Sequence, residues 1–383
     1  MIHSKYTVAI VFGTRPEFIK LVALIFKIKA LGFNVISINT GQHSEMLNSL
    51  MRFYDFEADY NLNLMSSSES LHDLYSQVIK EIGDIVQGVQ LDLVIVHGDT
   101  ASAAGAAFAC FLNKTPVVHV EAGLRSNDIH NPFPEEINRI VISQLTSLHL
   151  CPTLRARNNL IGEGVKDSSV HVTGNTVIDS MFMTLKMIQE SSDVFSSISE
   201  SLTRRVGFDF TEEKYIIFTC HRREVLGPSM LGIFEALRRV AEKRSDIRIV
   251  FPVHRNPKVI NAATLIFEGV SGVVVCDPPD YPEFLLLLKH CVGVITDSGG
   301  IQEEAPSFDK PVLVVRATTE RQEGIDAGCS KLVGIDPVRI ENEVLGLIDQ
   351  RSDYAEMKST LSPYGSGDSA LRSAEIIVNF LEK

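Results

Sequence analysis

The sequence predicts an α/β protein built on parallel sheets, and three features of the chain support this prediction. Short apolar runs recur along it, segments of helical periodicity lie between them, and the alternation is interrupted once. A short apolar run is typical of a strand buried on both faces, and strands that alternate with helices favour right-handed parallel crossovers. We therefore expect two α/β halves of similar size, each with its own parallel sheet.

The expected elements follow the chain in order. Each apolar run predicts one strand, and these runs lie at residues 7–12, 33–38, 91–97, 116–121, 214–219, 247–254, 272–276, 292–296 and 311–315. Helical periodicity predicts helices between them, including those at residues 17–31, 136–146, 230–243 and 283–290.

The interruption at residues 181–213 sets the expected domain boundary, because this stretch is polar and has no strand-like run. We expect an N-terminal domain at residues 1–178 and a C-terminal domain at residues 179–365. A last helix is expected at residues 369–381, and its own sequence fits packing on either half. A ligand is expected at the carboxyl ends of the strands, in the cleft between the two domains.

Composition narrows the classes of partner. The 383 residues include 36 Lys and Arg against 48 Asp and Glu, a formal charge of −12, which argues against nucleic acid or an anionic membrane as the main partner. A small anionic ligand in a local basic pocket fits this charge. Six cysteines are scattered singly without metal-ligand spacing, as buried thiols in a reducing compartment would be. We expect a soluble, cytoplasmic protein with no metal or other cofactor and no membrane-spanning segment.

The first expected strand ends in FGTRPEFIK, which is a candidate phosphate site. Gly13 permits a sharp turn, Pro16 suits a first helical turn, and Arg15 and Lys20 bring positive charge beside a helix N-terminus. An ordinary strand–turn–helix with surface cations would also explain this segment. The dinucleotide pattern GxGxxG and the P-loop pattern are not found in the sequence, which argues against those two classes.

A second candidate phosphate site lies in TDSGGIQEE, again at a strand end. Ser298 is placed to cap a helix, and Gly299 with Gly300 allows backbone amides to approach an anion. Glu304 follows on the helix and is a candidate for a ribose diol. A plain capped helix would need Ser298 but not two glycines. Arg321, on a loop after the next strand, is a candidate for closing on a diphosphate.

Acidic residues and histidines at strand ends are the candidates for proton transfer. Asp99, Glu121 and Glu135 are expected at one cleft, with His221 at the end of a strand in the other half. Asp99 could instead cap the following helix, Glu136 could simply begin its helix, and His221 and His254 could be structural histidines. Glu121 directly continues an apolar strand, so its carboxylate needs a partner or a chemical role.

Taken together, these segments resemble the UDP-N-acetylglucosamine 2-epimerases, in particular the non-hydrolysing bacterial type. The resemblance runs from Phe12 to Gly334 and rests on the order and spacing of FGTRPEFIK, TGQHSEML, VHGDT, HVEAGLR, NPFPEEINR, VTGNTVID, TCHRRE, PVHRNP, TDSGGIQEEAP and TERQEG. It implies a glycosyltransferase-B-like fold of two Rossmann-like domains, with residues 366–383 packing back on the N-terminal domain, and a homodimer.

The resemblance also implies the reaction. The family converts UDP-N-acetylglucosamine to UDP-N-acetylmannosamine by eliminating UDP to a 2-acetamidoglucal and adding it back. Inversion at C2 needs two proton-transfer groups, and the sequence leaves open which carboxylate is the acid and which the base. By resemblance the catalytic group is Asp99, Glu121, Glu135 and His221, and the substrate contacts are Arg15, Lys20, Phe284, Ser298, Gly299, Gly300, Glu304 and Arg321.

Two departures and several alternatives accompany the resemblance. Family members of this type are activated by their own substrate at a site formed by a Gln-His segment and an arginine. Gln42 and His43 are present here, but Ser68 stands where the arginine is expected, which predicts weak or no activation. Val225 stands where the family more often has a polar residue. The alternatives are a hydrolysing 2-epimerase, an enzyme acting on diacetamido-uronic acid sugars, a glycosyltransferase of the same fold and a non-catalytic UDP-sugar sensor.

Overall fold

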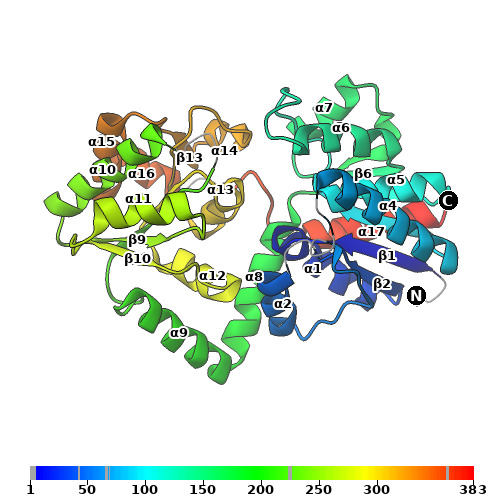
Figure 1. Ribbon diagram of the computed structural model, residues 1–383, viewed down its shortest axis with the longest axis horizontal. Coiled ribbons are helices and arrows are strands. Elements are labelled where there is room, and N and C mark those ends of the chain that lie inside the picture. Colours follow the sequence, from blue (N-terminus) through cyan, green and yellow to red (C-terminus); the bar gives the residue numbers. More distant parts are fainter. Residues whose placement is uncertain (1–5, 42–43, 65–67, 69, 223–226, 359–361) are drawn as a thin grey trace. The chain divides into compact units, whose positions relative to one another are not determined.

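The computed structural model describes residues 6–41, 44–64, 68, 70–222, 227–358 and 362–383. The chain divides into two compact units (Figure 1). Unit 1 comprises Met1–Ser180 together with Tyr364–Lys383, and unit 2 comprises Met181–Pro363. The predicted α/β class with two Rossmann-like parallel sheets is confirmed.

Unit 1 contains a parallel sheet that, among the described residues, has seven strands in the order β3-β2-β1-β4-β5-β6-β7. Helices cover both faces, so the central strands are buried throughout. The strands are β1 (Thr7–Phe12), β2 (Asn34–Asn39), β3 (Tyr60–Asn61), β4 (Leu93–His97), β5 (Val117–Val120), β6 (Leu148–Cys151) and β7 (Val170–Val172).

The helices of unit 1 are amphipathic or buried according to their place on this sheet. In α5 the small side chains allow close packing on α4, since a Cβ on Gly105 would come within 2.6 Å of Val78. The C-terminal helix α17 packs against α1 (Figure 1). The helices are α1 (Arg15–Ala30), α2 (Ser44–Phe53), α4 (Leu71–Gly88), α5 (Ala101–Leu112), α6 (Glu135–Leu145), α7 (Leu154–Gly162), α8 (Thr176–Glu190), which continues into unit 2, and α17 (Ser369–Leu381).

Unit 2 repeats the same topology with six parallel strands in its described part, ordered β10-β9-β8-β11-β12-β13. Its strands are β8 (Tyr215–Thr219), β9 (Arg248–Pro252), β10 (Val273–Cys276), β11 (Val294–Thr296), β12 (Val312–Val314) and β13 (Ser330–Leu332). Its helices are α9 (Ser192–Val206), α10 (Pro228–Lys243), α11 (Pro257–Phe267), α12 (Tyr281–His290), α13 (Gly299–Glu304), α14 (Gln322–Asp326), α15 (Pro337–Ile348) and α16 (Ser352–Lys358).

All nine predicted strands form, and the structure adds β3, β6, β7 and β13. The added strands lie at or near sheet edges and are two to four residues long, so their sequences carry no long apolar run. The expectation of burial on both faces is wrong for β10, because this edge strand leaves Val275 exposed. The last helix has the predicted bounds, and the polar stretch that interrupts the pattern forms most of α8 and α9.

The strand order of each sheet reverses at one point, and α/β sheets commonly bind ligands beside such a point, at the carboxyl ends of the strands. In unit 1 this point lies between β1 and β4, and in unit 2 it lies between β8 and β11. The loops that follow these strands carry Asp99, His221 and Ser298, and Arg15 begins the helix after β1. The topology therefore places the candidate residues of each unit at the position where α/β sheets bind ligands.

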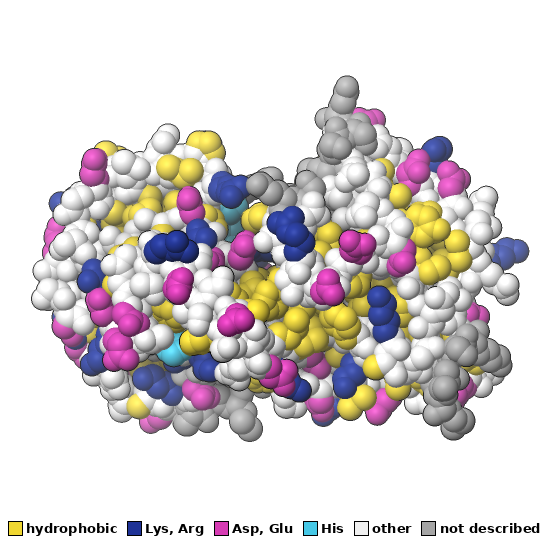
Figure 2. Space-filling view, turned by 90° about the horizontal axis from the view of Figure 1, so that it is seen from below, with side chains coloured by type: hydrophobic (Ala, Val, Ile, Leu, Met, Phe, Trp, Pro, Cys, Tyr) yellow, Lys and Arg dark blue, Asp and Glu magenta, His cyan; other side chains and the backbone are white. Residues whose placement is uncertain are grey.

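The cysteines, the surface charge and the apolar character of the helices can also be read from the structure. The six cysteines are buried and free, as predicted. On the face in Figure 2, acidic and basic side chains are interspersed and do not form one basic surface. In the part of the chain that the structure describes, no helix is both long enough and apolar enough to cross a membrane.

Candidate active site

Glu121 follows β5 and is the most constrained candidate in unit 1. Its backbone has φ of +62°, an uncommon value for a residue other than glycine, so the surrounding contacts must hold it in place. Its Oε2 atom forms an ion pair with Lys20 and accepts a hydrogen bond of 3.3 Å from Asn175 Nδ2. His97 Nε2 lies 3.8 Å from the same oxygen. The carboxylate thus has the partner that its place in the sequence requires.

His97 lies at the end of β4, and its imidazole is buried beside Glu121. Burial lowers the pKa of His97 to about 4, although the charge of Glu121 opposes this shift, so the ring is neutral near pH 7. Lys20 is also buried, and its ammonium group reaches Glu121. Its place in the sequence makes Lys20 a candidate for a phosphate, whereas the structure gives its side chain a carboxylate partner.

Asp99 is held by an arginine that sequence reasoning did not single out. Arg139, on α6, contacts Asp99 Oδ2 through Nη2 at 2.6 Å and Nε at 2.8 Å. The alternative reading of Asp99 as a helix cap is wrong, because Thr100 caps α5 by accepting a hydrogen bond from the backbone of Ala103. Asp99 is therefore an ionic partner at the strand end, with about a quarter of its side chain exposed.

Glu135 is the first residue of α6 and lies in the same neighbourhood as Asp99. Burial raises the pKa of Tyr75, and the negative charges of Glu135 and Asp99 raise it further. Both carboxylates consequently lie within electrostatic reach of one phenol. The structure thus brings Asp99 and Glu135 to one region at the carboxyl edge of the sheet.

The neighbouring Glu136 has a structural role. Its buried carboxylate accepts hydrogen bonds of 3.0 Å from the backbone N–H groups of Ser126 and Asn127 and contacts Arg139 Nη1 at 2.6 Å. Burial opposes ionisation, but these donors together lower the pKa of Glu136. Glu136 orders the loop after β5 and orients the arginine that holds Asp99.

The loop between β1 and α1 differs from a simple phosphate cradle. The buried Glu17 accepts hydrogen bonds from the backbone N–H groups of Gly13 and Thr14 at 3.0 and 2.9 Å, and from the Thr100 hydroxyl at 2.6 Å. Burial raises the pKa of Glu17 to about 7, against the effect of these donors. The two amides are therefore engaged by the protein itself, and Arg15 remains the candidate for an anion here.

In unit 2, Asp297 organises the strand-end histidine. This fully buried carboxylate accepts hydrogen bonds from the backbone N–H groups of His221 at 2.6 Å and Arg222 at 2.7 Å, and it lies 3.1 Å from His221 Nδ1. Burial opposes ionisation of Asp297, but the hydrogen bonds from His221 and the nearby backbone lower its pKa. His221 stacks on His254 with ring centroids 5.5 Å apart. The carboxylate fixes the ring and leaves Nε2 as its outward nitrogen.

Gly299 and Gly300, the first residues of α13, lie beside a cluster of arginines. A Cβ on Gly299 would lie within 3.5 Å of side-chain atoms of Glu320, Arg321 and Arg222, whereas one on Gly300 would meet nothing within 4 Å. Burial opposes ionisation of Glu320, but three neighbouring guanidinium groups lower its pKa to about 2. Such a cluster suits a diphosphate. The three arginines are Arg222, Arg316 and Arg321.

The remaining candidates of unit 2 lie nearby in the fold. Ser298 stands at the N-cap position of α13 but makes no capping hydrogen bond with its side chain. Glu304, at the end of the same helix, accepts a hydrogen bond of 2.9 Å from the buried Tyr281 hydroxyl. Phe284 lies one turn after Tyr281 on α12 and is partly buried. These contacts bring Glu304 and the start of α12 together.

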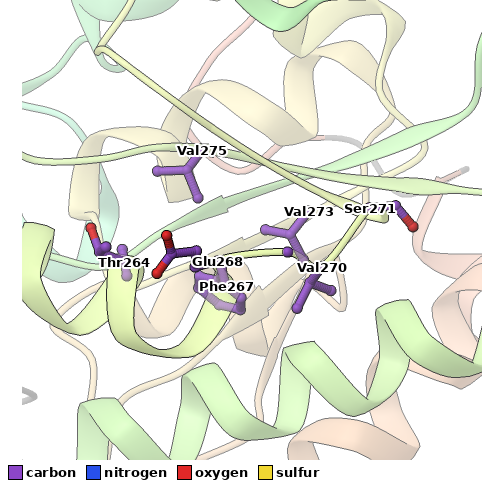
Figure 3. A pocket seen from close by; sticks show the side chains of 9 residues that line it. Thr264, Phe267, Glu268, Val270, Ser271, Val273 and Val275 are labelled. Carbon is purple, nitrogen blue, oxygen red and sulfur yellow. The ribbon is translucent and has the colours of Figure 1, made fainter.

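Two of the candidates, Gln42 and His43, lie outside the described residues, as does Val225. The described residues contain no group of three or more His, Cys, Asp or Glu that could hold a metal ion. A hollow of about 440 Å³ in unit 2 is lined by the end of α11 and by β10 (Figure 3). It contains none of the candidate residues, and Glu268 is its single ionisable lining residue.

Comparison with known proteins identifies the family. The sequence profile described as UDP-N-acetylglucosamine 2-epimerase matches residues 27–378. The chain belongs to the UDP-N-acetylglucosamine 2-epimerase family. Relatives of that name from Campylobacter jejuni and Escherichia coli K12 are each 39% identical; the alignments cover 98% and 96% of this chain, respectively, and 97% of each relative. A crystal structure of the Neisseria meningitidis UDP-GlcNAc 2-epimerase bound to UDP-GlcNAc is similar with a TM-score of 0.91 and 35% identity, over 97% of this chain and all of that one.

In this epimerase the structure adds residues that sequence reasoning missed. Each is a buried or largely buried partner of a candidate, and all except Tyr281 lie inside a quoted motif. For those five, the signal was a charged or amide side chain close to a strand end or to a candidate acid. They are Arg139, Asn175, Tyr281, Asp297, Glu303 and Glu320.

Proposed function

We propose that this epimerase interconverts UDP-N-acetylglucosamine and UDP-N-acetylmannosamine without releasing free sugar. The observation that carries the proposal is the pair of anchored carboxylates on neighbouring strand ends. Glu121 is paired with Lys20, and Asp99 is paired with Arg139. Inversion at C2 removes a proton from one face and delivers a proton to the other, so two fixed proton-transfer groups are what the reaction needs.

The proposed reaction proceeds by elimination and addition. A base takes the C2 proton, the C1–O bond breaks, and UDP leaves with that electron pair to give the 2-acetamidoglucal. UDP then adds back to C1 while C2 receives a proton on the opposite face. The C2 proton is not acidified by a neighbouring carbonyl, so stabilisation of the departing diphosphate supplies much of the lowering of the barrier.

The charged residues of unit 2 are suited to the nucleotide part. Arg222 and Arg321 lie beside Gly299 at the start of α13, and we assign this group to the diphosphate. The proposal assigns the ribose to Glu304, which Tyr281 orients. His221, fixed by Asp297, supplies a hydrogen bond from Nε2 to the departing diphosphate.

Proton NMR in deuterated buffer tests the function directly. We expect UDP-N-acetylglucosamine alone to acquire deuterium at C2 and to settle into a mixture of two UDP-sugars, because each return of the proton draws on solvent. Free N-acetylmannosamine with an equal amount of UDP would instead establish the hydrolysing alternative. Turnover only with a second sugar acceptor would establish a glycosyltransferase, and exchange only with a diacetamido-uronic acid nucleotide would establish that alternative. Binding of UDP-sugar without exchange would support a sensor.

The substrate response provides a separate prediction. Ser68 donates a hydrogen bond of 2.7 Å to the Leu64 carbonyl oxygen. Unlike arginine, it has no guanidinium to bind the phosphate of a second, activating substrate molecule. We expect hyperbolic initial rates against UDP-N-acetylglucosamine. Sigmoidal rates would contradict the inferred loss of activation. The Ser68→Arg variant, measured in the same assay, shows whether a guanidinium at this position introduces sigmoidal behaviour.

We also propose a cytoplasmic homodimer that supplies UDP-N-acetylmannosamine for polysaccharide biosynthesis. Exposed apolar side chains on the packed helices α5 and α6 support an interface on unit 1. They are Phe108, Phe111, Leu112, Ile137 and Val141.

A further inference from the structure

Asn175 lies where the chain is about to leave unit 1. It immediately precedes α8, and within that helix the chain passes into unit 2 after Ser180, to return at Tyr364. The residue is 3% exposed. A buried amide has four hydrogen-bonding positions, and leaving any of them unmet in the interior is costly.

The amide of Asn175 is used in two directions. Oδ1 accepts a hydrogen bond of 3.0 Å from the backbone N–H of Val177 and so caps α8. Nδ2 donates to Glu121 Oε2 at 3.3 Å. In addition, the backbone N–H of Asn175 donates to the Tyr364 carbonyl at 2.7 Å. Asn175 thus contacts α8, the chain segment that re-enters unit 1 at Tyr364, and the candidate catalytic carboxylate of Glu121.

Glu121 needs such support because its own backbone is strained. At φ of +62° its conformation is not fixed by local preference, and its Oε2 atom is the meeting point of three side chains. Lys20 supplies charge from α1, and His97 stands 3.8 Å away on β4 as a neutral ring. Asn175 supplies a directed N–H donor, which stabilises the ionised carboxylate and fixes its orientation.

We propose that Asn175 is a positioning residue for Glu121, holding its carboxylate ionised and in one orientation from the start of the crossover between the units. The inference rests on the proposed function for Glu121 as a proton-transfer group. It adds that the segment connecting the two units is part of the support of the reacting carboxylate. Residues of that segment should then affect the chemistry only when they reach Glu121.

Asp179 offers a matched control on the same helix. It is also largely buried, and its carboxylate accepts hydrogen bonds from the backbone N–H groups of Ser369 at 3.2 Å and Ala370 at 2.9 Å. Asp179 therefore ties α8 to the returning chain, as Asn175 does, but none of its described contacts includes Glu121. Substituting either residue should lower the stability of the connection between α8 and the segment that begins at Tyr364. Only substituting Asn175 should change the titration of the Glu121 carboxylate.

The experiment compares Asn175→Asp, Asn175→Ser and Asp179→Asn with the unaltered full chain. Both changes at 175 keep an oxygen that can cap α8. In Asn175→Asp a second carboxylate faces Glu121, so the pKa of Glu121 should rise. In a plot of kcat against pH, the limb that Glu121 governs should therefore move to higher pH by about one unit or more. We expect kcat to fall about 10- to 100-fold for Asn175→Asp and less for Asn175→Ser, with KM changed less than about threefold.

A carboxyl titration separates this inference from the proposed function. Carbon-13 NMR of protein labelled at glutamate carboxyls, with the Glu121 signal assigned through Glu121→Gln, follows Glu121 whether or not the enzyme turns over. The inference is supported if the Glu121 titration shifts in Asn175→Asp and stays in place in Asp179→Asn, which should show only a lower melting temperature. It is overturned if Asn175→Asp titrates like the unaltered chain, or if both positions shift it equally. Failure of C2 exchange in the unaltered chain would overturn the proposed function and leave this titration as the test of Asn175.

Discussion

Replacing Glu121 by glutamine is expected to lower kcat for C2 epimerisation by about 10²- to 10⁴-fold. The amide keeps the volume of the side chain and one oxygen for Lys20, but it can neither take nor return a proton. Lys20 is buried, and its ion pair with Glu121 becomes a contact with a neutral group. Affinity for UDP should change little, because Glu121 is assigned no contact with the diphosphate.

Deuterium incorporation at C2 and the overall rate together measure this effect. Glu81→Gln is the matched control, because Glu81 lies on α4 of the same unit, its side chain is 40% exposed, and its partner is the exposed Lys80. That control should retain the kcat of the unaltered chain within about twofold, as a surface substitution does. If Glu121→Gln exchanges the C2 proton at the rate of the control, Glu121 has no part in proton transfer. An unchanged melting curve for both variants would attribute the loss to chemistry and not to unfolding.

How far the sequence predicts the fold depends on where each element lies in its sheet. Central strands are predicted because burial on both faces requires a continuous apolar run, as at residues 7–12 and 93–97. Short strands at the margins need only a few backbone hydrogen bonds to a neighbour. β3 and β13 owe their conformation to pairing with β2 and β12, and their own residues carry little signal.

The candidate site shows the same division between local and long-range information. Strand-end position alone identifies Asp99 and Glu121, because the carboxyl edge of a parallel sheet collects such side chains. Their partners come from distant segments: Arg139 lies 40 residues after Asp99, and Asn175 lies 54 residues after Glu121. The charge and type of these residues do not predict which partner each one contacts in the folded chain. For the same reason the sequence offers the helix N-terminus after β1 as a candidate phosphate site, although Glu17 engages the backbone N–H groups of Gly13 and Thr14 there.

Asp297 is the second residue whose loss should have a large effect, on both stability and catalysis. Asp297→Ala leaves two buried backbone N–H groups and His221 Nδ1 without their acceptor, which should cost about 3 kcal/mol or more of folding free energy. Asp297→Asn keeps the shape and still accepts from the backbone, so it should fold. Its neutral amide then replaces the carboxylate beside His221 Nδ1 and no longer stabilises the imidazolium, the form in which Nδ1 faces Asp297 as a donor and Nε2 can donate to a phosphate. We expect kcat/KM to fall by about 10²-fold or more in Asp297→Asn.

The pH dependence of unfolding distinguishes the charge of Asp297 from its shape. The hydrogen bonds from His221 and the neighbouring backbone outweigh burial and lower the pKa of Asp297 in the folded state. A carboxyl of this kind binds fewer protons folded than unfolded, so its contribution to stability is present above its unfolded pKa and is lost as the pH falls through the folded pKa. The midpoint of urea unfolding, followed by circular dichroism, should therefore differ most between the unaltered chain and Asp297→Asn near neutral pH. The difference should narrow on acidification, whereas the exposed Asp277→Asn should match the unaltered chain throughout. A gap that stays constant with pH would mean that shape and hydrogen-bond geometry, and not the charge of Asp297, hold the His221 loop.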